Sequence, residues 1–346
     1  MLVCVTGGTG FVGAHSVAAL ARSGARVRLL VRDPSRVDRA LRPLGVEPAS
    51  LELVVGDVTD RPAVAKAVNG VHAVLHAASV YSFDSRRRAE MRATNVRGTQ
   101  LVLASAVRAG VDPIVHVSTV GAMFPAASGV IGAQSPPGMP REAYLASKSV
   151  AEAVARLHQQ EGAPVVITYP PALLGPYDPH LGDQSARLRN ALRGLLPVWP
   201  GGGFPVGDVR DTAELHAALL TKPARRRERH FGPGRYVTTR QYVQALRLAT
   251  GRALPTMFLP VRPMLPLGML TDVLQRVWPW HIPAEYGALY TCLHAAPVEA
   301  SASTYGILPR PISDTMADSV RWLHEAGHVS AHQAGRAASV FAESSA

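Results

Sequence analysis

Cysteine is scarce in this chain, which contains only Cys4 and Cys292 among its 346 residues. Two isolated cysteines exclude the disulfide framework of a small secreted domain, and they lack the close spacing of a zinc site. Cys4 lies in an apolar run and is expected to be buried and unreactive. The 13 histidines include no His-Glu-x-x-His or comparable cluster. We therefore predict no metal site and a reducing, cytoplasmic compartment.

Acidic residues are also few: 25 Asp and Glu residues stand against 36 Lys and Arg residues, so the formal net charge is +11. A nucleic-acid partner is one explanation for such a charge. However, the arginines are scattered except at 86–88 and 225–229, and neither run is interleaved with aromatic side chains. No helix-turn-helix or zinc-finger pattern occurs. We expect no nucleic-acid partner and attribute the charge to an arginine-rich composition and an anionic cofactor.

No hydrophobic run is long enough to cross a membrane, because a spanning helix requires about 20 consecutive apolar residues. The most apolar late stretch, 261–277, is interrupted by Pro263, Pro266, Asp272 and Arg276. No charged leader precedes the first expected strand, which argues against a signal peptide. We expect no membrane span and no lasting membrane contact, with a surface contact of 261–277 as the alternative.

The first half of the chain alternates short β-branched runs with amphipathic segments. Strands are expected over 2–6, 27–31, 51–55, 73–76, 114–117 and 165–168, and helices over 12–23, 61–68, 90–109 and 141–160. The strands are apolar throughout, as in a parallel sheet that is covered on both faces. This alternation predicts an α/β fold with a doubly wound parallel Rossmann sheet.

Beyond residue 170, proline and glycine become dense, and the expected helices, 211–220 and 239–250, are short. This change in composition predicts a smaller, mixed C-terminal lobe. We therefore divide the chain into an NAD(P)-binding domain (1–170, with elements that return to it around 205–235), a substrate-binding lobe (171–327) and a flexible tail (328–346).

The segment TGGTGFVG at 6–13 lies between the first expected strand and the first expected helix. Gly7 permits a tight turn, Gly10 allows the backbone to approach a pyrophosphate, and Gly13 allows the helix to pack closely on the strand. The helix N-terminus then offers free N–H groups to the phosphates. The expected cofactor contacts in this segment are Gly7, Thr9, Gly10, Phe11, Val12 and Gly13.

The end of the second strand selects the cofactor, because a carboxylate there binds the ribose hydroxyl of NAD whereas a cation binds the 2′-phosphate of NADP. The sequence has Arg32 at this point, with Asp33 after it and Arg36 as a supporting cation. We therefore expect NADP(H), with NAD(H) as the alternative. Asp57, beside Val58, follows the third strand and is expected to bind the adenine amine; the alternative is that it caps the next helix.

Tyr144 and Lys148 are four residues apart, a spacing that places them on one face of a helix. A neighbouring ammonium stabilises tyrosinate, so we expect it to lower the pKa of Tyr144 towards neutrality. Such a tyrosine can exchange a proton with a carbonyl or alcohol oxygen while hydride moves at the carbon. Ser118 and Thr119 follow the fifth strand, at the edge of the sheet where ligands bind, and one of their hydroxyls can polarise the reacting oxygen.

Seven motifs occur in the order typical of one enzyme family. They are TGGTGFVG at 6–13, VRDP at 31–34, GDVTD at 56–60, HAAS at 76–79, TNVRGT at 94–99, VST at 117–119 and YLASK at 144–148. On these motifs the chain resembles extended short-chain dehydrogenases/reductases of the NAD-dependent epimerase/dehydratase family, and most of all their dihydroflavonol-reductase-like and 3β-hydroxysteroid-dehydrogenase-like members. The resemblance covers about residues 1–250.

The resemblance implies a role for each matched residue. Tyr144 is the implied acid/base, Lys148 lowers its pKa and holds the nicotinamide ribose, Thr119 is the third catalytic hydroxyl, and Ser118 touches the cofactor. Further implied cofactor contacts are Ala77, Ala78, Ser79, Asn95, Pro171 and Leu173, of which Asn95 is expected mainly to brace the backbone.

Two departures from the family pattern stand in the loop at 169–176, where Tyr169 replaces an arginine and Leu174 replaces a tyrosine. Asp211 matches a later family segment and is expected to be a helix N-cap.

The expected function is NADP(H)-dependent interconversion of a ketone and a secondary alcohol on a hydrophobic small molecule that resembles a steroid, a polyketide or a flavonoid. A nucleotide-sugar epimerase or dehydratase with tightly bound NAD is the first alternative; Val120, and not an acidic pair, follows Thr119, which disfavours a dehydratase. A non-catalytic NADP-sensing protein is the second, disfavoured because Tyr144 and Lys148 are both present. A homodimer through 90–109 and 141–160 is expected as an alternative to a monomer.

Overall fold

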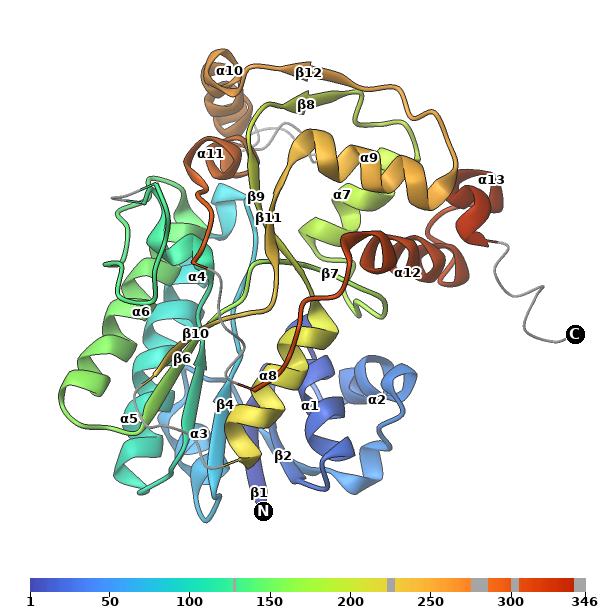
Figure 1. The fold of residues 1–346 in the computed structure, drawn as a ribbon. Helices are drawn as coiled ribbons and strands as arrows, with labels where there is room; N and C mark the ends of the chain where they lie inside the picture. Colours follow the sequence, from blue (N-terminus) through green and yellow to red (C-terminus); the bar gives the residue numbers. More distant parts are fainter. Residues whose placement is uncertain (127–128, 223–227, 275–285, 300–304, 339–346) are drawn as a thin grey trace, which may run out of the picture.

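The computed structural model describes residues 1–126, 129–222, 228–274, 286–299 and 305–338. It contains a parallel sheet covered by helices on both faces, with a second lobe above the carboxyl ends of the strands (Figure 1). This architecture confirms the predicted α/β fold.

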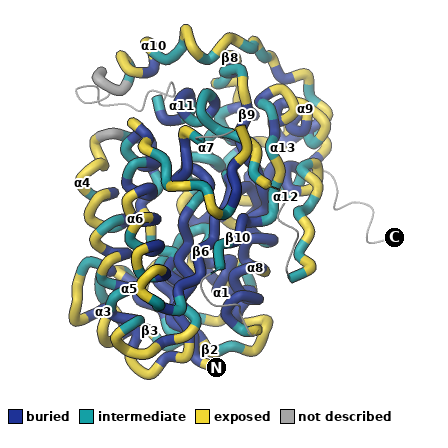
Figure 2. The backbone as a smooth tube through the Cα atoms, turned by 60° about the vertical axis from the view of Figure 1, so that its left-hand side comes forward, coloured by how far each residue is buried: buried dark blue, intermediate teal, exposed yellow. Residues whose placement is uncertain are grey.

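The main sheet has seven parallel strands in the order β10-β6-β5-β4-β1-β2-β3. They are β1 (Leu2–Thr6), β2 (Arg26–Val31), β3 (Glu52–Val55), β4 (Ala73–His76), β5 (Ile114–Val117), β6 (Val165–Tyr169) and β10 (Arg229–Phe231). Every residue of β1, β4, β5 and β6 is buried, which explains their apolar sequences (Figure 2). The chain order reverses between β1 and β4, and a crevice at that point is the usual ligand site of such sheets.

Two helical layers cover the sheet. One contains α1 (Phe11–Arg22), α2 (Ser35–Leu41) and α8 (Val209–Thr221); the other contains α3 (Arg61–Val68), α5 (Thr99–Arg108) and α6 (Ala143–Gln160). Helix α8 belongs to the returning part of the chain, and its N-cap is Asp208, whose carboxylate accepts a hydrogen bond from the backbone N–H of Arg210 at 2.8 Å. The prediction that Asp211 is the cap is wrong, because Asp211 lies inside the first turn and binds Arg310.

The single helix predicted over 90–109 is interrupted. It starts as α4 (Arg88–Met91), continues through a π-helical segment (Arg92–Gly98) and becomes α5. A π-turn inserts one extra residue and is often found near functional sites. Here it carries Asn95, which is 1% exposed.

The second lobe has a three-stranded sheet in the order β11-β9-β7 and a pair formed by β12 and β8. The strands are β7 (Ala172–Leu174), β8 (Val198–Pro200), β9 (Gly203–Asp208), β11 (Arg235–Thr238) and β12 (Met257–Leu259). The helices are α7 (Asp183–Leu192), α9 (Thr239–Thr250), α10 (Val261–Leu274), α11 (Tyr286–His294), α12 (Ile312–Glu325) and α13 (Ala331–Ala334). A third apolar cluster, which includes Trp199, Tyr242 and Met316, fills the space between them.

The C-terminal segment differs from the prediction of a flexible tail. Residues 331–338 form α13 and a 3₁₀ turn, and the buried side chains of Ala334 and Ala337 belong to the same cluster as those of α9 and α12. Small side chains pack closely without the periodic pattern of larger apolar residues, so the sequence does not reveal this contact. Residues 339–346 lie outside the described part of the chain.

Among the described residues, no helix combines the length and apolar character needed to cross a bilayer. Within the same ranges, no group of three or more metal-binding side chains could hold an ion. Cys4 and Cys292 are both buried free thiols.

Candidate active site

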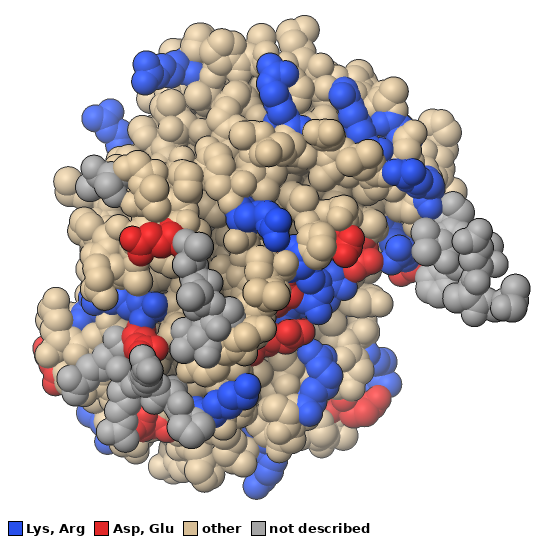
Figure 3. Space-filling model, in the orientation of Figure 1, with Lys and Arg blue, Asp and Glu red and all other residues tan. Residues whose placement is uncertain are grey.

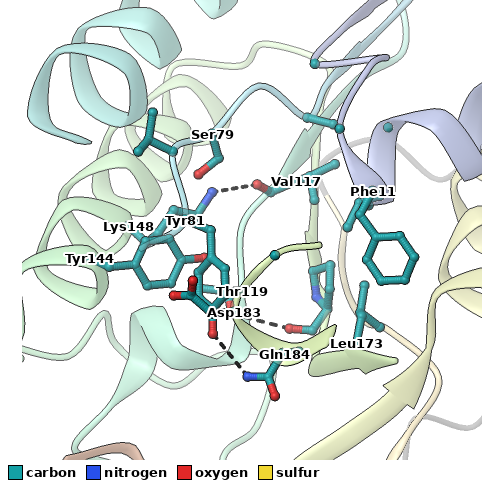
Figure 4. Close-up of a pocket in the computed structure, with 18 of the residues that line it drawn as sticks. Phe11, Ser79, Tyr81, Val117, Thr119, Tyr144, Lys148, Leu173, Asp183 and Gln184 are labelled. Atoms are coloured by element: carbon teal, nitrogen blue, oxygen red, sulfur yellow. Dashed lines mark hydrogen bonds between the residues drawn. The ribbon is translucent and has the colours of Figure 1, made fainter. Parts of the chain in front are cut away.

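A cavity of about 630 Å³ lies at the carboxyl ends of β1, β4 and β5 and extends to α7 and α11 (Figure 4). Nearly every residue predicted for the site lines this cavity. They are Gly7, Thr9, Gly10, Phe11, Val12, Gly13, Arg32, Asp57, Val58, Ala77, Ala78, Ser79, Ser118, Thr119, Tyr144, Lys148, Pro171 and Leu173. Of the predicted residues, only Asn95 is absent from the wall.

The glycine-rich loop forms one wall almost entirely from backbone. Gly7 has a φ of +74°, and a Cβ atom there would lie 2.6 Å from the nitrogen of Ala78. A Cβ on Gly13 would collide with the carbonyl oxygen of Gly7, so that position must be glycine for α1 to pack on β1. Gly10 is the N-cap of α1. The positive end of the α1 dipole therefore faces the cavity, as a pyrophosphate site requires.

Two arginines, Arg32 and Arg36, lie where the cavity reaches the end of β2. The side chain of Arg32 is 62% exposed, and its Nε lies 3.8 Å from the Oδ2 of Asp57. Asp33 is not part of the wall: its carboxylate accepts hydrogen bonds from the N–H and hydroxyl of Ser35 and from Arg36. The Asp33 carboxylate, which could have bound the ribose of NAD, is therefore hydrogen-bonded within the turn before α2.

Asp57 does not cap α3, so that alternative is wrong. The cap position belongs to Asp60, while Asp57 Oδ1 accepts hydrogen bonds from the N–H and hydroxyl of Thr59 at 2.8 and 2.7 Å. The Asp57 carboxylate is thereby fixed at the rim of the cavity beside Arg32.

Asn95 makes hydrogen bonds with both ends of its amide. Its Oδ1 accepts from Ser79 Oγ at 3.1 Å and from the N–H of Val80 at 2.8 Å. Its Nδ2 donates to the carbonyl of Val80 at 3.0 Å and to Ser147 Oγ at 2.9 Å. The prediction of a cofactor contact is therefore corrected: Asn95 lies behind the wall and ties the loop after β4 to helix α6, next to Lys148.

Helix α6 holds Tyr144 in its first turn and Lys148 in the next. The N-cap is Glu142, whose carboxylate accepts hydrogen bonds from the N–H groups of Tyr144 and Leu145 at 2.9 and 2.7 Å. The ring of Tyr144 lies edge-on to that of Tyr81, with 4.7 Å between centroids. Both α6 side chains point into the cavity from the same side (Figure 4).

The pKa of Tyr144 differs from the prediction. Burial raises it, and the carboxylates of Glu142 and Asp183 add to the rise. The Nζ of Lys148, one turn further along α6, donates to the carbonyl of Val117 at 2.8 Å. Burial also lowers the pKa of Lys148 to about 8, so the ammonium is still charged at neutral pH. The surroundings of Tyr144 therefore favour the protonated phenol.

Ser118 and Thr119 reach the cavity directly after β5. The hydroxyl of Thr119 lies 3.4 Å from the carbonyl of Pro170 and caps the short turn after it through the N–H of Gly121. The hydroxyl of Ser118 is buried and has no hydrogen-bond partner among the described residues. An unpartnered hydroxyl on the cavity wall fits a site that binds a polar ligand.

Tyr169, which replaces the family arginine, takes part in a buried network behind the site. Its hydroxyl donates to Glu152 Oε1 at 2.6 Å and accepts from Arg156 at 3.0 Å. Arg156 also donates to Glu152 Oε1 at 2.6 Å. Arg156, two turns after Lys148 in α6, thus binds the side chain that stands where the family pattern has an arginine.

The far end of the cavity was not predicted residue by residue. Aromatic and apolar side chains line most of it, and three polar side chains come from α7. The lining residues are Tyr81, Phe83, Phe124, Asp183, Gln184, Arg187, Phe204, Ala288, Thr291 and Cys292. Gln184 donates to the hydroxyl of Tyr81 at 3.0 Å. The spacing D-Q-x-x-R at 183–187, which places three polar groups on one helical face, is the signal in the sequence that could have identified this wall.

Comparison with known proteins agrees with this geometry. The model of the NAD dependent epimerase/dehydratase family matches residues 3–234. Sterol demethylase protein B of Methylococcus capsulatus is 30% identical over 335 residues, which are 95% of this chain and 100% of that protein. A putative dihydroflavonol 4-reductase of Synechocystis is 34% identical over 215 residues, 61% of each chain. The crystal structure of gox2253 superposes with a TM-score of 0.78 at 26% identity and covers 95% of this chain and 99% of that one.

Proposed function

The chain belongs to the NAD dependent epimerase/dehydratase family and is an NAD(P)-dependent oxidoreductase; from this premise we propose that it interconverts a ketone and a secondary alcohol on a hydrophobic small molecule, with NADP(H) as the hydride carrier. One observation carries the proposal: Tyr144, Lys148 and Thr119 line the same cavity as the glycine-rich loop and as the aromatic side chains of Tyr81, Phe83 and Phe204.

The residues of the cavity fit a dinucleotide. We assign the pyrophosphate to the N-terminus of α1 at Gly10, the adenosine 2′-phosphate to Arg32 and Arg36, and the nicotinamide ribose to Lys148. NADPH is favoured over NADH because two cations reach this part of the wall whereas the carboxylate of Asp33 is held by its own turn. The bound cofactor supplies the hydride.

The proton comes from the protein. A ketone oxygen placed between Tyr144 and Thr119 receives two hydrogen bonds, which polarise the carbonyl and stabilise negative charge as it develops. Tyr144 then gives its proton to that oxygen. Because burial raises the pKa of Tyr144, the phenol carries its proton at neutral pH, as a general acid must. Lys148 stabilises the tyrosinate that remains.

The substrate class follows from the far end of the cavity. Tyr81, Phe83 and Phe204 offer flat apolar surface, on which rings pack well. Gln184 and Arg187 offer hydrogen-bond donors for a polar group at the distal end of the substrate. A rigid polycyclic ketone with a hydroxyl at its far end satisfies both requirements. The names of two relatives, a sterol demethylase protein and a putative dihydroflavonol 4-reductase, refer to ring systems of this kind.

The test is a cofactor titration followed by a substrate screen. Purified protein is first checked for a dinucleotide that co-purifies and is then titrated with NADPH and NADH by fluorescence. We expect NADPH to bind at least ~10-fold more tightly, a difference of about 1.4 kcal/mol, and NADPH oxidation in the presence of a steroid or flavanone ketone. Co-purifying NAD that resists exchange, together with turnover of a nucleotide sugar, would contradict the proposal and support the epimerase alternative.

A further inference from the structure

An exposed apolar surface lies at the top of the second lobe, away from the active-site chemistry. It is formed by β12 and by the outward face of α10, which follows β12 directly in the chain. The exposed fractions are 57% for Met257, 57% for Leu267, 49% for Met269 and 54% for Leu270. Val198, which pairs with Met257 across the two-stranded sheet, extends the surface onto β8. Water-exposed apolar groups clustered in this way are typical of interaction sites.

Helix α10 is apolar on both faces. Its inner face packs on α11 at Gly268, where a Cβ atom would lie 2.8 Å from Leu289 Cδ1. Its outer face presents Pro263, Pro266, Leu267 and Leu270 to solvent. A surface helix of a water-soluble domain normally has a polar outer face, whereas the outer face of α10 is largely apolar.

Arginines lie on and next to the elements that form this surface. Between Glu228 and Asp272, the latter in the last turn of α10, the chain has six arginines and no carboxylate side chain. Arg240 lies over the ring of Phe258 in β12, 4.4 Å from its centroid, and Arg247 donates to Thr256 just before β12. Arg262 is exposed in the first turn of α10. At the top of the molecule, the visible face in Figure 3 shows Lys and Arg among uncharged residues and no Asp or Glu.

We propose that this surface, called here the α10–β12 face, docks on the anionic surface of a lipid bilayer. The apolar side chains would contact the boundary of the acyl chains, and the neighbouring arginines would contact the negatively charged headgroups. The inference favours the alternative that the sequence left open, a membrane-surface contact of 261–277, over the expectation of no lasting membrane contact, because in the fold the apolar side of 261–271 faces outward.

The position of the face links it to the cavity. Helix α11, on which α10 packs, contributes Ala288, Thr291 and Cys292 to the cavity wall. Docking would therefore bring the substrate end of the cavity within one helix of the bilayer, where hydrophobic molecules accumulate. Binding itself does not depend on the reaction proposed above, so the two can be tested separately.

The experiment is vesicle co-sedimentation of the full chain. Vesicles of phosphatidylcholine are compared with vesicles that also contain phosphatidylglycerol, at low and high salt. We expect binding to the anionic vesicles and weaker binding at high salt. The double variant Leu267→Glu/Leu270→Glu should bind at least ~10-fold more weakly, because it removes apolar insertion and adds repulsion.

The matched control is Met139→Glu/Leu308→Glu, which adds the same charge at side chains that are 91% and 77% exposed on other faces. It should bind like the unchanged chain, and both double variants should retain their thermal midpoints. If the glutamates unfold the lobe, Leu267→Gln/Leu270→Gln replaces them.

Three outcomes overturn the proposal: no binding of the unchanged chain to anionic vesicles, equal weakening by both double variants, or a dimer in light scattering that the α10 variant separates while vesicle binding is absent. The last outcome would assign the face to a second copy of the chain.

Discussion

Asn95→Ala provides a sharp test of the site architecture, because the sequence suggested a cofactor contact whereas the structure shows a brace. The side chain is 1% exposed and satisfies the N–H and the carbonyl of Val80, itself a buried residue. It also bonds Ser79 and Ser147. Ser79 is exposed and can turn to water, and Ser147 keeps its bond to the carbonyl of Tyr144. The two backbone groups of Val80 therefore carry most of the cost.

A buried backbone group left without a partner costs about 1–3 kcal/mol. Two such groups, with some relief from water entering the vacated space, give an expected loss of about 3 kcal/mol in the free energy of unfolding. With a urea dependence of roughly 3 kcal/mol per molar for a chain of this size, the midpoint should fall by about 1 M. Turnover should also fall, because Tyr81 and Lys148 both lie next to groups that Asn95 holds in place.

The assay is urea unfolding followed by circular dichroism, together with NADPH titration of the folded variant. Asn69→Ala is the control, since Asn69 is exposed at the end of α3 and its side chain makes no hydrogen bond within the described chain; its midpoint should change little. Ordinary surface substitutions change stability by about 0.5 kcal/mol or less. If Asn95→Ala loses no more than this but loses much of its NADPH affinity, Asn95 contacts the cofactor and does not brace the backbone.

Three further predictions concern the proposed chemistry. Tyr144→Phe should lower turnover by ~10²-fold or more, the scale of general acid catalysis, while NADPH affinity measured by fluorescence stays nearly constant; full activity would remove Tyr144 from the mechanism. Arg32→Ala should weaken NADPH binding by ~10-fold through loss of a charge-assisted contact and leave NADH binding almost unchanged; equal effects on both cofactors would show that Arg32 does not read the 2′-phosphate. Because burial lowers the pKa of Lys148 to about 8, its ammonium is charged below that pH and neutral above it, so kcat/KM for reduction should be level below pH 8 and fall above it. In Lys148→Arg, whose guanidinium remains charged, any residual activity should lose this alkaline decline; an unchanged decline would assign it to another group.

Local patterns predicted the main sheet well. Short apolar runs bounded by polar turns specify buried parallel strands, and six of the seven strands of that sheet start and end within one residue of their predicted positions. The glycine-rich loop was also predictable, because Gly7 and Gly13 have no steric alternative at their positions. The spacing of Tyr144 and Lys148 on one helix needs no tertiary information.

Other features depend on contacts that no local pattern encodes. Helix α8 begins before its predicted start, so Asp208 caps it, and Asp211 instead binds Arg310, about 100 positions later in the chain. Tyr169, Glu152 and Arg156 form one hydrogen-bond network only because the fold brings β6 and α6 together. The pKa of Tyr144 was predicted from one neighbour, Lys148, whereas burial against Tyr81 and Phe83 dominates in the folded chain.

The sequence by itself thus determined the fold class, the family and the identity of the groups at the centre of the cavity, since these follow from spacing along one strand, one loop or one helix. The tertiary structure decided which groups face the cavity, which stand behind it as Asn95 does, and which apolar side chains remain in water on α10. Burial and exposure depend on packing between segments that are distant in the chain, so no local sequence pattern encodes them.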